Sequence, residues 1–152
     1  MRWLIGIGAG VIAALLVVLL VEAFGSVLYP LPEVTGAIDP REQAQWIPNQ
    51  PFPAKLLHLL AWGGGTLVGA GLAIHLGARR IFAFVVALAV MLRNSFALSA
   101  MAYPGWMWFA AVLLPLAAAW AAWRYMPRRV PAAEPAPLMP PPPGTGPGPT
   151  WY

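Results

Sequence analysis

The chain has 152 residues, of which 60% are hydrophobic and only 9% are charged, whereas a soluble domain typically carries about 25% charged residues. This composition excludes an ordinary soluble globular protein. The formal charge is +4, but the basic residues lie at the ends of apolar segments and form no single patch, so we expect no nucleic-acid partner. Cysteine is absent, which excludes disulfides, thiolate metal sites and cysteine nucleophiles.

Four apolar segments are long enough to cross a membrane as helices. A bilayer core about 30 Å thick needs roughly 20 helical residues, because each backbone N–H and C=O must find its partner within the segment. The sequence therefore predicts an all-α, polytopic four-helix bundle over residues 1–129, with the bilayer as its surroundings. The predicted helices cover residues 3–24, 54–77, 81–100 and 105–123.

An alternative interpretation of the first apolar segment is a cleaved signal peptide, because Ala23 and Gly25 before Ser26 are typical of a cleavage site. The apolar run of about 20 residues is longer than the usual 7–15 residues of such a peptide. Glu22 also lies just before the supposed site. We therefore favour a retained helix.

The arginines indicate how the four helices are threaded. Six of them flank the apolar segments and fall on the same side of the membrane if the chain crosses it four times, namely Arg2, Arg79, Arg80, Arg124, Arg128 and Arg129. The first connection is slightly acidic. Because cytoplasmic connections carry the excess of Lys and Arg, we expect both termini in the cytoplasm and the first connection outside.

Two segments outside the helices have their own patterns. Within the outer loop 25–53, Asp39, Pro40 and Glu42 form a capping-box pattern, which predicts a short helix at about 40–47. Residues 130–152 are rich in proline, with four consecutive prolines at 140–143. This composition predicts a disordered or polyproline-II tail.

Small residues recur along one face of each of the first two predicted helices. These seam residues are Gly6, Gly10 and Ala14 on the first helix, and Ala61, Gly65, Gly69 and Ala73 on the second. Such spacing lets two helix backbones approach closely. An antiparallel pairing sets Gly10 level with Gly69, and the sequence therefore predicts a tight pair. In the alternative interpretation, residues 63–65 form a flexible or broken helical segment that lines a cavity.

Three ionisable residues within the predicted spans form a candidate polar cluster at the outer end. The pairing above sets Glu22 level with His58, and Arg93 on the third helix can extend its side chain outward. Intramembrane charges are costly and suggest a function. One interpretation is an ion pair that neutralises Arg93, with His58 hydrogen-bonded nearby. The other is a proton or ligand site that opens to the outside.

The sequence predicts neither a metal site, nor a cofactor, nor catalytic residues. His58 and His75 lie on the same predicted helix, about 25 Å apart, so they cannot ligate one centre. The chain contains no third histidine. It also lacks the serine elbow, the zinc helix and the phosphate loop of common enzyme families.

Several short motifs are similar to those of short bacterial membrane proteins of uncharacterised function. They are Val21-Glu22-Ala23, Leu28-Tyr29-Pro30-Leu31-Pro32, Asp39-Pro40, Trp46-Ile47-Pro48, the glycine-rich stretch 60–66 and Tyr103-Pro104-Gly105-Trp106. The chain resembles this family over residues 3–123. Members commonly have a His-Pro pair where this chain has Tyr103-Pro104. The resemblance implies a four-helix bundle in the bacterial inner membrane and supplies no activity.

These observations favour a non-enzymatic multi-pass membrane protein that acts through lipid or protein contacts as an accessory or interaction subunit. Its expected partners are a membrane protein or a second copy of the chain. The alternative is a small proton-coupled transporter that uses Glu22, because small multidrug transporters also have four helices and a glutamate in the first. A lipid-modifying enzyme ranks third, because no nucleophile accompanies Glu22, His58 and Arg93.

Overall fold

The computed structural model describes residues 2–30, 48–77, 79–100 and 103–127. Within these ranges the regular structure is entirely helical. The helices are α1 (Arg2–Leu28), α3 (Phe52–Gly77), α4 (Phe82–Ala100) and α5 (Gly105–Tyr125). Each is long and apolar enough to cross a membrane. The predicted all-α fold class, with four helices that are each able to cross a membrane, is therefore confirmed.

The ends of α1 and α3 differ from the prediction. Helix α1 continues to Leu28 instead of ending at residue 24, and α3 begins at Phe52 instead of residue 54. Nothing in the sequence stops α1 before Pro30, and the amide of Tyr29 still donates to the carbonyl of Gly25 at 2.9 Å. The predicted helix at 40–47 and the tail at 130–152 lie outside the described residues.

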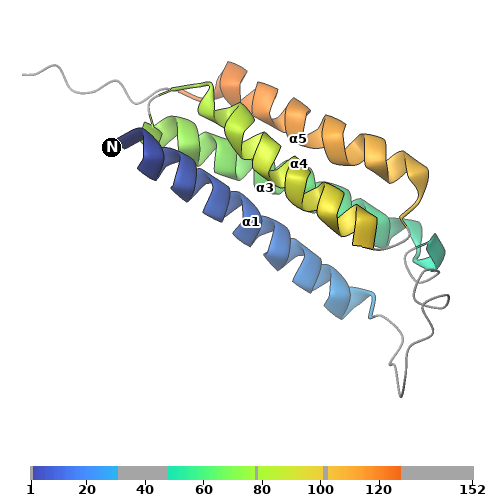
Figure 1. Cartoon of the computed structure of the whole chain (residues 1–152). Coiled ribbons are helices and arrows are strands. Elements are labelled where there is room, and N and C mark those ends of the chain that lie inside the picture. The colour runs from blue at the N-terminus through green and yellow to red at the C-terminus, as the bar shows by residue number, and fades with distance from the viewer. Residues whose placement is uncertain (1, 31–47, 78, 101–102, 128–152) are drawn as a thin grey trace, which may run out of the picture.

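Consecutive helices run antiparallel in one bundle (Figure 1). Helix α3 packs against α1, α4 and α5, and α4 also packs against α1 and α5. Helices α1 and α5 lie on opposite sides and do not contact each other in the described ranges. The weakest of these packings is that of α1 on α4. A pocket described below lies where these two helices meet.

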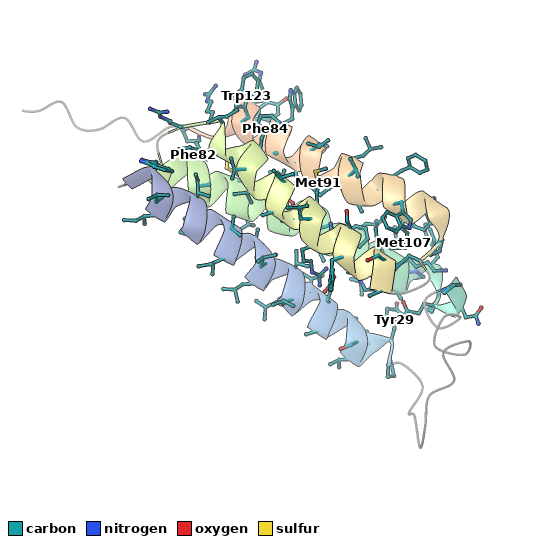
Figure 2. The ribbon with its side chains drawn as sticks, viewed as in Figure 1. Tyr29, Phe82, Phe84, Met91, Met107 and Trp123 are labelled. Atoms are coloured by element: carbon teal, nitrogen blue, oxygen red, sulfur yellow. The ribbon has the colours of Figure 1, made fainter. Side chains whose placement is uncertain are left out.

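The two ends of the bundle have different chemistry. One end of the bundle contains the start of α1, the turn between α3 and α4, and the end of α5 (Figure 1). This end carries Arg79, Arg80 and Arg124, and we call it the arginine end. The opposite end is called the Glu22 end. In Figure 2, Tyr29 marks the Glu22 end and Trp123 marks the arginine end. Four of the six flanking arginines, Arg2, Arg79, Arg80 and Arg124, therefore lie at one end of the bundle, and Arg128 and Arg129 lie outside the described residues.

The seam residues bring α1 and α3 into backbone contact. A Cβ on Gly10 would lie 2.6 Å from the carbonyl oxygen of Gly69, and one on Gly65 would lie 2.8 Å from the carbonyl oxygen of Ala14. Real Cβ atoms do not approach other atoms so closely. The remaining seam residues Gly6, Ala61 and Ala73 are also buried. The structure thus brings the seam residues of both helices together.

Helix α3 passes through its three consecutive glycines without a break. Gly63 and Gly64 have open space where a Cβ would stand, whereas Gly65 faces α1. A break in the helix at these glycines is therefore wrong, because the backbone remains helical through all three of them.

Candidate functional site

A cavity of about 420 Å³ lies at the Glu22 end, between α1, α3 and α4. We call it the Glu22 pocket. Its polar lining residues are Glu22, Ser26, Tyr29, Gln50, His58, Arg93 and Tyr103, and its apolar lining residues are Gly25, Ala54, Leu57, Phe96, Ala97 and Ala100. A volume of this size is typical of pockets that bind small molecules.

The lining follows from helical periodicity. Residues 22, 25, 26 and 29 share one face of α1 and its end, residues 54, 57 and 58 share one face of α3, and residues 93, 96, 97 and 100 share one face of α4. These positions belong to the last two turns of α1 and α4 and to the first two turns of α3. The pocket therefore opens near the end of the bundle and not at its middle.

Arg93 and Glu22 form a two-pronged ion pair in the wall of the pocket. Arg93 Nη1 donates to Glu22 Oε1 at 2.7 Å, and Nη2 donates to Oε2. The side chain of Glu22 is 20% exposed and that of Arg93 is 29% exposed. Paired N–H···O bonds between a guanidinium and a carboxylate fix both groups and are stronger than neutral hydrogen bonds.

His58 lies beside this pair but is held mainly by aromatic neighbours. Its Nδ1 atom is 3.8 Å from Glu22 Oε1, which is too far for a hydrogen bond. The imidazole lies edge-on to the ring of Tyr103, with 6.0 Å between the centroids, and 6.4 Å from the ring of Trp62. The structure thus brings Glu22, His58 and Arg93 together, with an ion pair between two of them and His58 adjacent.

Tyr103 closes the pocket from the connection between α4 and α5. Burial raises the pKa of its phenol, and the negative charge of Glu22 raises this pKa further, more than Arg93 lowers it. The phenol therefore keeps its proton at neutral pH and can donate a hydrogen bond. The sequence drew attention to this residue only through the Tyr-Pro pair, and its contact with His58 is a tertiary feature.

The pocket contains further polar residues that the sequence interpretation did not select. Ser26 lies one helical turn after Glu22, so its spacing could have identified it. Gln50 lies before α3, and its Oε1 atom is buried without a hydrogen-bond partner among the described residues. No periodicity could have placed Gln50, because it precedes the helix.

The arrangement offers binding groups more readily than catalytic ones. The hydroxyl of Ser26 donates to the carbonyl of Ala23 at 2.8 Å, so its proton is directed to its own helix. Among the described residues it has no hydrogen bond to His58, whereas a serine nucleophile normally contacts its base directly. His75 is exposed near the other end of α3. No group of three His, Cys, Asp or Glu residues suited to a metal occurs in the described ranges.

No protein-family model matches the chain, and no curated protein and no solved structure matches it. The function proposed below therefore rests on the fold and on the geometry of the Glu22 pocket.

Proposed function

We propose that this protein is a non-enzymatic, multi-pass protein of the bacterial inner membrane that binds a lipid-like amphiphile in the Glu22 pocket and serves as an accessory or interaction subunit. The observation behind this proposal is the pocket itself, in which the Glu22–Arg93 ion pair faces a cavity with largely apolar walls. Such a cavity suits a molecule with a small polar head and an apolar body.

The depth of the pocket supports an amphiphile. Arg93 lies seven residues before the end of α4, or about 10 Å along the helix axis. The pocket thus extends from the membrane surface to the upper acyl region. With the arginine end in the cytoplasm, as the positive-inside rule requires, the pocket faces the outer leaflet.

The alternative, proton-coupled transport through Glu22, has less support from this geometry. Arg93 contacts both carboxylate oxygens of Glu22, so an incoming proton or cation would have to compete with the guanidinium for the charge of Glu22. Substrate sites of secondary transporters also lie near the bilayer midplane, whereas this pocket lies near one end of the bundle. Uptake into liposomes that is driven by a proton gradient and abolished by Glu22→Gln would overturn our preference.

The binding proposal is tested by filling the pocket. Ala97 lines the cavity, so Ala97→Phe places a ring inside it, whereas Ala117→Phe adds the same ring to an exposed position on α5. We expect native mass spectrometry to detect bound lipid on the wild type and on Ala117→Phe, and a loss of at least about tenfold on Ala97→Phe. Equal lipid on all three proteins would contradict the proposal.

The proposed accessory role has a separate test. We expect mild-detergent purification of the tagged full chain from its own membranes to yield a stoichiometric membrane-protein partner or a second copy of the chain. A chain that is monomeric and alone after crosslinking in intact membranes would exclude this role and leave the binding proposal intact.

A further inference from the structure

We infer that the Glu22 pocket selects its ligand by net charge, and that it takes the headgroup of a lipid that carries no net charge and bears an N–H or O–H donor. This inference rests on the proposed binding function and names its ligand class. It derives from the charges in the pocket, from one buried acceptor and from the position of the pocket mouth.

The described residues that line the pocket carry no net formal charge when histidine is counted as neutral. Among the described residues that line it, Glu22 is the only acid, and Arg93 is the only Lys or Arg residue. These two residues neutralise each other through paired contacts. A ligand with a net charge would therefore bring an uncompensated charge into a partly buried site, which is costly in surroundings of low dielectric constant.

The hydrogen-bonding groups left over in the pocket indicate what the headgroup must supply. Gln50 Oε1 is buried and has no partner among the described residues, so it requires a donor. A guanidinium has five N–H donors, of which two point to Glu22, and the phenol of Tyr103 is a further donor. A headgroup with a donor of its own would satisfy Gln50 Oε1, and its phosphate, ester or hydroxyl oxygens would accept hydrogen bonds from Arg93 and Tyr103.

The rim of the pocket lies on the lipid side of the bundle. Ser26 on α1 and Phe96 and Ala100 on α4 line the cavity and are exposed, and Phe96 is 78% exposed. Helices α1 and α4 pack together more weakly than any other contacting pair. A lipid can therefore enter sideways between them, with its headgroup at Arg93 and its chains along the apolar side chains of Leu57 and Phe96.

Two kinds of bacterial membrane lipid share this chemistry. Phosphatidylethanolamine is zwitterionic and donates through its ammonium group, and diacylglycerol is uncharged and donates through its hydroxyl group. Phosphatidylglycerol has similar chains and a hydroxyl donor but carries a net negative charge. Dodecyltrimethylammonium supplies a cationic amphiphile without a donor.

The experiment measures the affinity of these four probes for the purified full chain by native mass spectrometry in a non-ionic detergent. For the wild type, we expect phosphatidylethanolamine or diacylglycerol to bind at least about tenfold more tightly than phosphatidylglycerol, because a net charge would be left without a partner. The tighter of the two identifies the source. Equal or tighter binding of phosphatidylglycerol would overturn the inference.

Removal of one charge should reverse the selectivity. Glu22→Gln leaves Arg93 unpaired, so we expect phosphatidylglycerol to become the preferred probe. Arg93→Gln leaves Glu22 unpaired, so we expect dodecyltrimethylammonium to gain affinity. The double variant Glu22→Gln with Arg93→Gln is again neutral and should regain the wild-type order, whereas Arg124→Gln at the arginine end should not change it.

The outcomes separate this inference from the proposed function. If no probe binds the wild type and Ala97→Phe changes nothing, the binding function itself fails. If the probes bind and Ala97→Phe abolishes their binding, but the order of their affinities is the same in the charge variants as in the wild type, only the charge rule fails. Where a single variant does not fold, the wild type and the neutral double variant still decide the rule, because both must prefer the lipids without net charge.

Discussion

Gly10 of α1 and Gly69 of α3 face each other without any side chain between their backbones, and a methyl group on Gly10 would lie 2.6 Å from the carbonyl oxygen of Gly69. The neighbouring atoms are backbone atoms or the Cβ of Ala73, which cannot rotate away. This contact sets the register of α1 on α3. It thereby sets the relative height of Glu22 and His58 in the pocket.

The first prediction concerns this backbone contact. Gly69→Ala should lower the free energy of unfolding by about 1–3 kcal/mol, because an added carbon in a packed contact forces the helices apart. Gly69→Leu should prevent assembly of the bundle. The measurement is unfolding in mixed micelles, followed by tryptophan fluorescence.

Gly64 supplies the matched control for this prediction. It lies on the same helix five residues away, and a Cβ there would meet nothing within 4 Å. Gly64→Ala and Gly64→Leu should leave the stability unchanged or slightly raise it, since glycine is the poorer helix former. Equal losses at both positions would contradict the prediction, because Gly64 has no close contact across the bundle and helix propensity favours alanine and leucine over glycine.

The second prediction concerns the coupling between Glu22 and Arg93. Loss of one partner of a fully buried ion pair costs about 3–5 kcal/mol. Both side chains here are partly exposed, so we expect each of Glu22→Gln and Arg93→Gln to cost less, about 1–3 kcal/mol. The double variant should cost less than the sum of the two, and a double-mutant cycle measures the difference. Strictly additive costs would mean that the two-pronged contact contributes nothing to stability.

The four spans could be predicted from the sequence because the bilayer imposes one length and one composition on every crossing helix. The seam could also be found, because a repeat of four residues places small side chains on one helix face. The predicted end of α1 at residue 24 lies four residues before the observed end at Leu28, because Glu22 and Gly25 suggest an interface although only Pro30 interrupts the backbone hydrogen bonds. Polarity indicates where the apolar segment ends, whereas the hydrogen-bonding pattern determines where the helix ends.

The pocket itself could be predicted only in part. Glu22, His58 and Arg93 stand out because charge is rare in apolar segments. Phe96 and Gln50 gave no such signal, because one is an ordinary lipid-facing aromatic residue and the other precedes a helix. Whether residues of three helices enclose a cavity or pack solidly depends on how α1 and α4 meet. Periodicity within each helix contains no information about the angle at which α1 and α4 cross.

The third prediction concerns orientation in the membrane. The chain has no cysteine, so a single introduced cysteine reports its own position against a clean background. Asn49→Cys, exposed at the Glu22 end, should react with a membrane-impermeant maleimide in spheroplasts. Pro127→Cys, exposed beyond α5 at the arginine end, should react only after the membrane is opened. The opposite pattern would invert the proposed topology and place the Glu22 pocket in the inner leaflet.

The fourth prediction concerns alkaline pH and Tyr103. In the folded protein the pKa of this phenol is raised above its ordinary value of 10.0, so the unfolded chain loses this proton first as the pH rises. Deprotonation then favours the unfolded state, and the free energy of unfolding should fall as the pH rises above about 10 until the folded phenol also ionises. Tyr103→Phe has no proton to lose at this position, so its stability should fall less steeply over the same pH range. Unfolding measured for both proteins at matched pH values cancels the contributions of the other titrating groups. Parallel curves would show that Tyr103 ionises equally in both states and that folding does not raise the pKa of its phenol.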